Sequence, residues 1–331
     1  MNIAINGFGR IGRVIFRVCM ERKLNVVAIN DPHDIKSTAY LLKYDSVYGN
    51  FHGKIVIKGP DMLIVNGKKI VVVHERDPEK LPWKKLGIDV VVESTGAFRD
   101  AKKAAKHLKA GAKKVIISAP AENHDATILP GVNTEVLNKN LKIISCASCT
   151  TNALGPVAKV LEENFGIEKG MMNTIHAYTS SQGLIDDDAR KLRRGRAGAV
   201  NIVPSTSGAT TATAEALPYL RNKLDGLAIR VPVMNGSIVD FTVLLKKKVS
   251  VQQVNDAFKK AAAGKLKGIM GYTEDEIVST DIIGDKRSSI IDGLSTKVVG
   301  GNLVKVLSWY DNEYGYSNRL VDLIVLFGKS K

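Results

Sequence analysis

Residues 1–13 have the sequence MNIAINGFGRIGR, which contains a short strand, a glycine-rich turn and the start of a helix. The apolar stretch at 2–6 predicts the strand, and Gly7, Gly9 and Gly12 follow it with the spacing GxGxxG. Beyond the glycines, apolar residues recur at i, i+3, i+4, i+7 and i+8, namely Ile11, Val14, Ile15, Val18 and Cys19. The pattern predicts an amphipathic helix with Cys19 in the core.

The next apolar stretch, LNVVAIND at 24–31, predicts a second strand parallel to the first and closes a βαβ unit. Asp31 ends this strand, nineteen residues after Gly12. An acidic residue here accepts hydrogen bonds from both ribose hydroxyls of an adenosine and repels a 2′-phosphate, while the helix N-terminus holds a pyrophosphate. The sequence therefore predicts an NAD site rather than an NADP site. The structural alternative is a turn that only packs strand on helix, with Asp31 as a turn residue before Pro32.

Further Val/Ile-rich stretches predict strands covered on both faces, at 54–58, 69–73, 88–95, 113–118 and 141–145, with a helix at 100–110. Residues 1–148 are thus predicted to be an NAD-binding domain with a Rossmann doubly wound parallel sheet. Ser94, Thr95 and Gly96 end the strand at 88–95. They are expected in the crevice where such sheets bind ligands, although a simple turn has the same composition.

The second half changes character, because longer alternating stretches at 170–178, 227–233, 238–247 and 303–312 predict a mostly antiparallel sheet. Helices are predicted at 149–165, at 250–262 and from about 316. We expect an α+β catalytic domain over 149–312, and a C-terminal helix within 313–331 that packs back onto the first domain. The fold class is therefore α/β.

Length, charge and cysteine content limit the function classes. A chain of 331 residues is longer than a single hydrophobic core usually supports, which favours two domains. Three cysteines are too few for a disulfide framework. No signal peptide or membrane span is apparent, so a cytoplasmic location is expected. The formal net charge of +15 attracts anions, which leaves a nucleic-acid-binding protein as a second hypothesis. Its basic run, Lys191–Arg196, has no interleaved aromatic residue for stacking on bases.

The stretch SCASCTTNAL at 145–154 contains two thiols three residues apart. Cys149 lies at the predicted start of the 149–165 helix, where the helix dipole favours a thiolate, so it is the candidate nucleophile. A zinc site needs a second pair of ligands that the chain does not offer, and no metal is expected. A redox motif or a structural turn remains as an alternative. Among six histidines, His176 lies in a predicted strand, where a histidine is more often a hydrogen-bonded structural residue than a catalytic one.

Seven motifs together resemble the phosphorylating glyceraldehyde-3-phosphate dehydrogenases, in order and spacing along essentially the whole chain. They are NGFGRIGR, SCASCTTN, HAYT, LRRGRAGAVNIVPSTSGA, AIRVP, VDFTV and SWYDNEYGYSNR. The resemblance implies NAD-dependent oxidation of D-glyceraldehyde 3-phosphate to 1,3-bisphosphoglycerate through a hemithioacetal and a thioester. Erythrose-4-phosphate dehydrogenase and the semialdehyde dehydrogenases share this thiol chemistry and are the alternatives.

The resemblance also implies residue roles. Cys149 is similar to the family's nucleophile, His176 to its general base and Asn312 to the residue that orients the nicotinamide. Adenosine and pyrophosphate contacts are implied for Phe8, Arg10 and Ile11 with Asp31. The substrate phosphate would meet Thr179 and Arg230, and the inorganic phosphate Ser148, Thr150, Ser207 and Gly208, with Arg194 as a helper. A homotetramer is implied, with no obligate nucleic acid and no membrane.

The chain departs from the family pattern after HAYT, where Ser180 to Gly183 replace the usual Asn-Asp-Gln-Arg. Ser181 stands where an Asp usually supports the first anion site, so the substrate-phosphate affinity is in question. Asp186–Asp188 lie in a loop that, in the family, reaches the adenosine ribose bound by a neighbouring subunit. The trio would then further repel a 2′-phosphate, or it is simply a solvated acidic loop.

Overall fold

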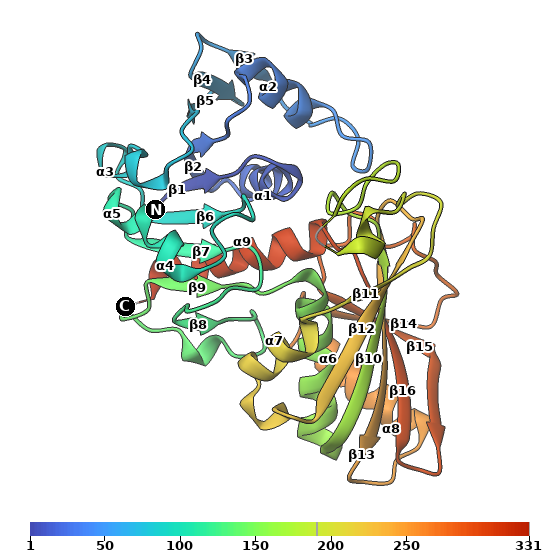
Figure 1. Cartoon of the computed structure of the whole chain (residues 1–331). Helices are drawn as coiled ribbons and strands as arrows, with labels where there is room; N and C mark the ends of the chain where they lie inside the picture. Colours follow the sequence, from blue (N-terminus) through green and yellow to red (C-terminus); the bar gives the residue numbers. More distant parts are fainter. Residues whose placement is uncertain (190, 331) are drawn as a thin grey trace. The chain divides into compact units, whose positions relative to one another are not determined.

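A computed structural model describes residues 1–189 and 191–330, in which the chain forms two units with one large sheet each (Figure 1). Unit 1 comprises Met1–Ile128, Glu135–Ala147 and the chain from Leu320 onward. Unit 2 comprises Leu129–Thr134 and Ser148–Arg319. No helix within the described residues is both long enough and apolar enough to cross a membrane.

The sheet of unit 1 confirms the predicted parallel, doubly wound type. Its order among the described residues is β3 (Ile55–Ile57), β4 (Met62–Val65), β5 (Lys68–Val73), β2 (Asn25–Asn30), β1 (Asn2–Asn6), β6 (Val90–Glu93), β7 (Lys114–Ile117), β9 (Ile143–Ser145) and β8 (Ala126–Thr127). Neighbouring strands are parallel from β5 through β2, β1, β6, β7 and β9 to β8. At the other end of the sheet, β3, β4 and β5 are antiparallel and form its edge. The prediction that 54–58 is covered on both faces is wrong, because Val56 and Ile57 lie at this edge and are about 40% exposed.

The first helix, α1 (Arg10–Glu21), follows the glycine turn as predicted and buries one face against the sheet. Cys19 on that face is fully buried, and burial raises its pKa to about 12. The single helix predicted at 100–110 is instead two short ones, α4 (Ala101–Ala104) and α5 (Lys106–Lys109), which meet at Ala105. Two further helices, α2 (Ile35–Lys43) and α3 (Trp83–Leu86), were not predicted.

The sheet of unit 2 confirms the predicted mostly antiparallel type. Its order is β11 (Val203–Thr206), β12 (Leu224–Val231), β10 (Ile167–Ala177), β13 (Ser237–Leu245), β16 (Leu303–Tyr310), β15 (Ser289–Val299) and β14 (Met270–Thr273). Two pairs within it are parallel, β10 with β12 and β14 with β15. The β10–β12 register places His176 directly opposite Arg230, which brings two of the predicted site residues together.

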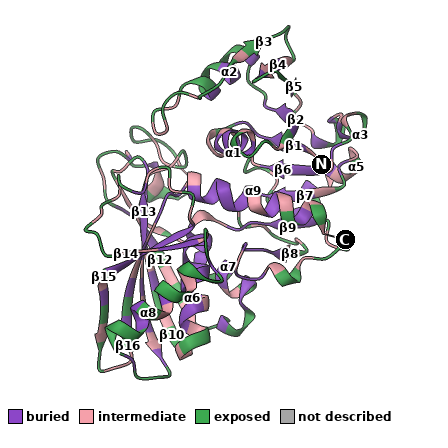
Figure 2. Ribbon diagram, turned by 180° about the vertical axis from the view of Figure 1, so that it is seen from behind, coloured by how far each residue is buried: buried purple, intermediate pink, exposed green. Residues whose placement is uncertain are grey.

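Helices α6 (Cys149–Phe165), α7 (Ala209–Ala216) and α8 (Val251–Ala263) accompany this sheet, with α6 packed against both other helices. Helix α6 continues without interruption through Pro156, and its sheet-facing residues are buried (Figure 2). The last helix, α9 (Tyr314–Lys329), begins in unit 2 and continues in unit 1. Its predicted apolar stripe is fully buried at Leu320, Leu323, Ile324 and Phe327.

Candidate functional site

The candidate nucleophile and base lie side by side in unit 2. Cys149 is the first residue of α6, and its sulfur is 3.4 Å from His176 Nε2 on β10. His176 is 3% exposed, whereas Cys149 is partly exposed. Ser148 caps the same helix, because its Oγ accepts a hydrogen bond from Thr151 N at 3.1 Å. A thiol at a helix N-terminus within reach of an imidazole is the arrangement of an activated cysteine.

The other imidazole nitrogen of His176 has two competing partners. His176 Nδ1 lies 2.7 Å from the Ala177 carbonyl oxygen and 2.8 Å from Arg230 Nη1, which also donates to that carbonyl at 3.0 Å. When Nδ1 carries the hydrogen and donates to Ala177, the lone pair of Nε2 faces the sulfur of Cys149. In that tautomer His176 is set up to accept the thiol proton.

Burial controls the protonation of this pair. Burial, reinforced by the Arg230 guanidinium, lowers the pKa of His176 to about 3. Burial also raises the pKa of the Cys149 thiol, while Arg230 and hydrogen bonding from Thr150 act in the opposite direction. The thiolate that the helix N-terminus was predicted to favour is thus opposed by desolvation. Cys149 therefore needs a neutral base beside it to lose its proton, and the imidazole of His176 lies within reach of its sulfur.

Tyr310 supports both halves of the pair, and the sequence did not single it out. Its hydroxyl lies 2.9 Å from Thr150 Oγ1 and 2.8 Å from Thr174 Oγ1, and its ring stands edge-on to that of His176 with 6.0 Å between centroids. Burial raises the pKa of this phenol, so it remains a hydroxyl. The available signals were the SWYDN motif and the alternation that puts Thr174 and His176 on one face of the strand.

Of the residues predicted to bind the substrate phosphate, Thr179 lies near Ser181 and Arg194, whereas Arg230 lies beside His176. Thr179 Oγ1 lies 2.9 Å from Ser181 Oγ, and Arg194 Nη1 reaches Ser181 Oγ at 3.4 Å while its Nε donates to Ser205 Oγ at 2.7 Å. Arg230 contacts His176 instead. Ser181, the departure from the family pattern, therefore joins Thr179 to Arg194. A hydroxyl at this position keeps Arg194 close without neutralising its charge.

Residues predicted for the inorganic phosphate lie at two helix N-termini. Ser148 and Thr150 are at the start of α6. Gly208 is the N-cap of α7, and Ser207 Oγ accepts a hydrogen bond from Ala209 N at 3.2 Å. Helix N-termini attract anions, so each of these two positions has the chemistry that an inorganic phosphate needs.

Asn312 is held in one orientation in unit 2. Its Oδ1 accepts hydrogen bonds from Ser237 Oγ at 2.8 Å and from Gly236 N at 3.2 Å, and the residue is 4% exposed. Since both contacts use the oxygen, the amide nitrogen is the end of the group left to meet a ligand.

The three glycines of the turn in unit 1 have different reasons to be glycine. Gly7 has φ +91°, and a Cβ there would lie 2.6 Å from Thr95 N; at Gly12 it would lie 2.1 Å from the Gly7 carbonyl oxygen. A Cβ at Gly9 would meet no atom within 4 Å. The fold therefore explains Gly7 and Gly12, whereas the close approach of a ligand explains Gly9. Gly9 is also the N-cap of α1 and makes no side-chain cap, so the turn fits a dinucleotide pyrophosphate.

Neighbouring residues show which side chains border this turn. Asp31 accepts hydrogen bonds from Phe8 N at 2.8 Å and His33 N at 3.0 Å, which holds its carboxylate at the end of β2. The Phe8 ring is buried edge-on against Phe16, and the Arg10 guanidinium pairs with Asp45. The Phe8 N–H is thus engaged by Asp31, and the Phe8 and Arg10 side chains are engaged by Phe16 and Asp45, so the cofactor contacts of these two residues stay a prediction. Ile11 is partly exposed on the first turn of α1.

Comparison with known proteins agrees with the geometry. The family model described as "Glyceraldehyde 3-phosphate dehydrogenase, C-terminal domain" matches residues 148–312, and the corresponding "NAD binding domain" matches residues 1–101. A glyceraldehyde-3-phosphate dehydrogenase of Geobacillus stearothermophilus is 54% identical over 98% of this chain and 97% of its own length. One of Thermotoga maritima is 56% identical over 99% of both chains. The chain belongs to the glyceraldehyde-3-phosphate dehydrogenase family.

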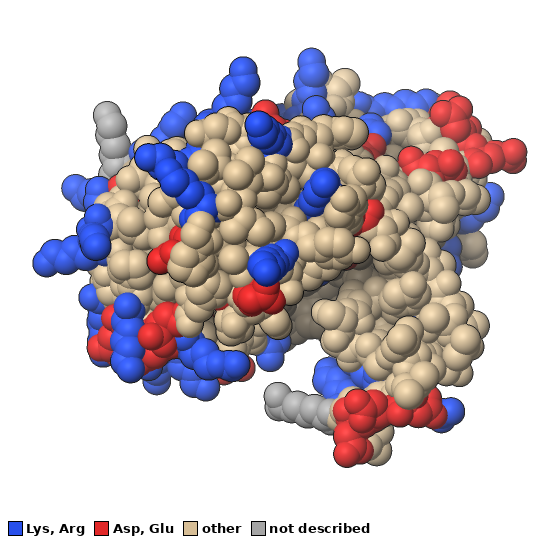
Figure 3. All heavy atoms as spheres, turned by 90° about the horizontal axis from the view of Figure 1, so that it is seen from above, with Lys and Arg blue, Asp and Glu red and all other residues tan. Residues whose placement is uncertain are grey.

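As a glyceraldehyde-3-phosphate dehydrogenase, the chain is an NAD-dependent oxidoreductase of glycolysis, and NAD is its cofactor. These matches do not favour the erythrose-4-phosphate and semialdehyde alternatives. On the face shown in Figure 3, Lys and Arg side chains are interspersed with acidic ones and form no continuous stripe of the kind that binds nucleic acid.

The acidic loop of this family member is partly tied within its own chain. Asp186 pairs with Arg196 at 2.6 Å and accepts a hydrogen bond from Ala197 N at 3.0 Å. Asp187 and Asp188 are exposed. Within the described residues, no group of three His, Cys, Asp or Glu side chains could hold a metal ion.

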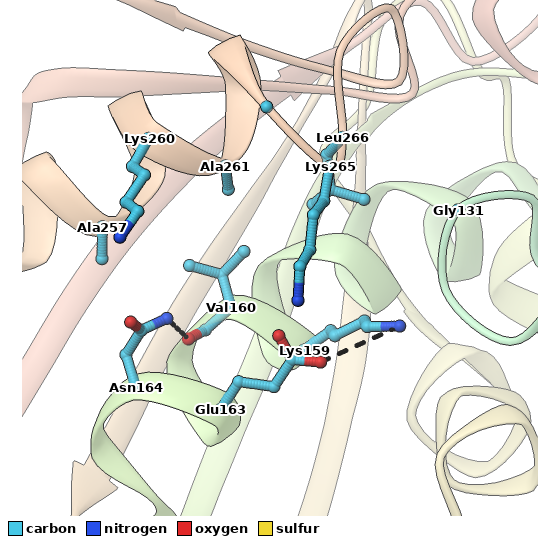
Figure 4. A pocket seen from close by; sticks show the side chains of 11 residues that line it. Gly131, Lys159, Val160, Glu163, Asn164, Ala257, Lys260, Ala261, Lys265 and Leu266 are labelled. Carbon is cyan, nitrogen blue, oxygen red and sulfur yellow. Dashed lines mark hydrogen bonds and ion pairs between the residues drawn. The ribbon is translucent and has the colours of Figure 1, made fainter.

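A pocket of about 390 Å³ in unit 2 lies away from these glyceraldehyde-3-phosphate dehydrogenase residues (Figure 4). It lies between α6 and α8, and three lysine side chains extend around it, those of Lys159, Lys260 and Lys265. None of the predicted site residues lines it. A larger pocket in the same unit, of about 810 Å³, has Arg194 and Ser207 among its lining residues.

Proposed function

We propose that unit 1 is the NAD-binding domain, that unit 2 is the catalytic domain, and that Cys149 and His176 carry the oxidation of glyceraldehyde 3-phosphate to 1,3-bisphosphoglycerate. One observation carries this assignment: the Cys149 sulfur lies at the start of α6, 3.4 Å from His176 Nε2. Glycine spacing, Asp31, and Ser94 to Gly96 at the end of β6 support the first domain as the cofactor site.

The oxidation begins when the Cys149 sulfur attacks the aldehyde carbon and its proton passes to His176 Nε2. This forms a carbon–sulfur bond and a hemithioacetal. NAD, when bound, supplies the hydride acceptor. His176 passes this first proton to the carbonyl oxygen, which becomes the hydroxyl of the hemithioacetal. The neutral imidazole then takes the hydroxyl proton back as the hydride leaves the carbon, and a thioester remains on Cys149. The low pKa of His176 favours its rapid return to the neutral base.

Phosphorolysis then releases the product. An inorganic phosphate oxygen attacks the thioester carbon, the carbon–sulfur bond breaks, and the sulfur regains a proton. Ser148, Thr150, Ser207 and Gly208 hold this phosphate, and the N-terminus of α6 stabilises its charge. Thr179, Arg194 and Arg230, together with Ser181, hold the phosphate of the substrate. Asn312 presents its amide to the nicotinamide carboxamide.

The proposed enzyme is a cytoplasmic homotetramer. Apolar side chains on the 184–202 segment support self-association, because five of them are 70 to 87% exposed: Leu184, Ile185, Leu192, Val200 and Ile202. Exposed apolar groups concentrated in one segment are typical of a protein interface. The family resemblance supplies the tetrameric state and the location.

Substitution of the nucleophile tests the proposal. Cys149→Ala should lower phosphate-dependent NADH formation from glyceraldehyde 3-phosphate by about 10⁴-fold or more, because the thioester can no longer form. Cys146→Ala is the matched control, since Cys146 is buried nearby, and it should retain most of the rate. Initial rates with and without inorganic phosphate provide the measurement. Undiminished activity of Cys149→Ala would refute the proposed mechanism.

A further inference from the structure

The carboxyl edge of the unit 1 sheet contains a row of buried polar side chains that the proposed chemistry does not use. Asn30, Asn6 and Glu93 end the adjacent strands β2, β1 and β6 in register, and each is at most 4% exposed. Asn30 Nδ2 donates to Asn6 Oδ1 at 2.6 Å, and Asn6 Nδ2 donates to Glu93 Oε2 at 2.5 Å. Burying polar side chains costs folding free energy unless each of them is hydrogen-bonded. The hydrogen bonds of this row therefore indicate what it does.

The ionisation of Glu93 follows from its partners. Trp83 Nε1 donates to His107 Nδ1 at 3.0 Å, which makes Nδ1 an acceptor and places the hydrogen of the neutral ring on Nε2. His107 Nε2 lies 3.0 Å from Glu93 Oε2 and donates to it. Since Asn6 also donates to this oxygen, Glu93 meets only donors here and is a carboxylate. His107 is fully buried, so no water molecule competes with it for the Glu93 carboxylate.

The second oxygen of Glu93 holds the turn that follows β6. Glu93 Oε1 accepts hydrogen bonds from Thr95 N at 2.8 Å and from the Thr95 hydroxyl. That hydroxyl oxygen in turn accepts from Ala97 N at 3.0 Å. Between them Gly96 has φ +76°, the left-handed conformation of a tight turn. Glu93 therefore determines the conformation of residues 95–97 directly and through Thr95.

This turn is closely packed against the glycine turn. Ser94 Oγ donates to the Gly7 carbonyl oxygen at 2.7 Å, and a Cβ at Gly7 would lie 2.6 Å from Thr95 N. A shift of Thr95 would consequently displace Gly7 and the start of α1. The backbone that receives the pyrophosphate is thus supported from beneath by one buried carboxylate.

We propose that Glu93 is a positioning residue for NAD: it holds the 95–97 turn against the glycine turn and so fixes the geometry of the pyrophosphate site. The inference rests on the proposed NAD-dependent function and adds a residue that touches neither substrate nor the reacting atoms. Gln cannot replace Glu93, because its amide NH₂ would face N–H donors on whichever side it turned.

Direct NAD binding tests the proposal by isothermal titration calorimetry of the full chain without substrate. Glu93→Gln should raise the Kd for NAD about tenfold, the loss expected for hydrogen bonds to a charged group. The turnover number at saturating NAD and the KM for glyceraldehyde 3-phosphate should change less than about twofold. Asp89→Asn is the matched control, because Asp89 holds Asn2 N at 2.7 Å at the opposite end of β6. It should leave the Kd for NAD unchanged.

A second pair keeps the test decisive if Glu93→Gln folds poorly. Thr95→Val removes the hydroxyl that bonds Glu93 and should raise the Kd for NAD, whereas Thr95→Ser keeps the hydroxyl and should restore wild-type affinity. An unchanged Kd in folded Glu93→Gln or Thr95→Val, or equal weakening by Asp89→Asn, would overturn the proposal. Because binding is measured without turnover, a failure of the Cys149 mechanism would leave this readout intact.

Discussion

His176 combines complete burial with an adjacent guanidinium, so its neutral form is built into the folded state. Its pKa is lowered from 6.5 to about 3, whereas the unfolded chain titrates near the ordinary value. Below about pH 6.5 the unfolded state therefore binds a proton that the native state does not, and acid destabilises the fold through this residue. Its stabilising contribution is complete above that pH and is lost as the pH falls toward 3.

The prediction is a pH-dependent difference between wild type and His176→Gln. From about pH 7.5 to about pH 5, the wild-type free energy of unfolding should fall by about 2 kcal/mol more than that of the variant. Urea unfolding at matched protein concentration measures this, and the other five histidines cancel because both proteins contain them. Parallel pH dependences would show that His176 is protonated in the native protein.

Gly9 and Gly12 offer a matched pair of substitutions. Gly9→Ala should raise the Kd for NAD about tenfold and cost at most about 1 kcal/mol of stability, since its Cβ meets only the ligand's space. Gly12→Ala should instead lower stability by more than about 2 kcal/mol, because its Cβ would overlap the Gly7 carbonyl oxygen. Thermal unfolding and NAD titration separate the two effects. Equal Kd values for wild type and Gly9→Ala would remove the ligand-based reason for this glycine.

Helices α6 and α8 both begin with a capping box, at Ser148 with Thr151 and at Ser250 with Gln253. Each serine substituted by Ala should therefore lose about 1 kcal/mol of stability. Only Ser148→Ala should also raise the KM for inorganic phosphate, because only α6 begins at the active cysteine. A similar rise of this KM in Ser250→Ala would mean that the effect comes from general destabilisation.

Helices and strands in which apolar residues recur at regular spacing were predictable from the sequence. Elements that depend on pairing with distant strands were not. Helices α1, α6 and α8 and the central strands follow from patterns over a few neighbouring residues. Antiparallel β3 and β4, and the short α2, carry weaker patterns because edges and exposed helices need little burial. The pairing of His176 with Arg230 depends on β10 and β12 lying in parallel register, which links residues 54 positions apart and leaves no local signal.

Oligomer formation is the prediction for the whole molecule. Leu184→Ser combined with Leu192→Ser should shift the protein from tetramer toward smaller species at micromolar concentration, because both side chains are at least 85% exposed in the single chain. Val136→Ser, an exposed apolar residue outside that segment, serves as the control. Sedimentation velocity measures the distribution. A double variant that remains tetrameric would place the interface elsewhere.

At the same scale, the predictions of a base and of two anion sites came from the family resemblance, because physical patterns in the sequence do not indicate them. The geometry adds what the resemblance left open. Ser181 bridges Thr179 and Arg194, Tyr310 contacts both Thr150 and the His176 ring, and the side chains of Phe8 and Arg10 contact Phe16 and Asp45.

The three thiols differ sharply in accessibility, since Cys19 and Cys146 are fully buried while Cys149 is reachable from solvent. A chromogenic disulfide reagent applied to the native protein should therefore react with one thiol per chain, that of Cys149. Unfolding the protein in guanidine should then expose the thiols of Cys19 and Cys146. The ratio of the two thiol counts, taken from one sample, gives the fraction of chains in which Cys149 is reactive.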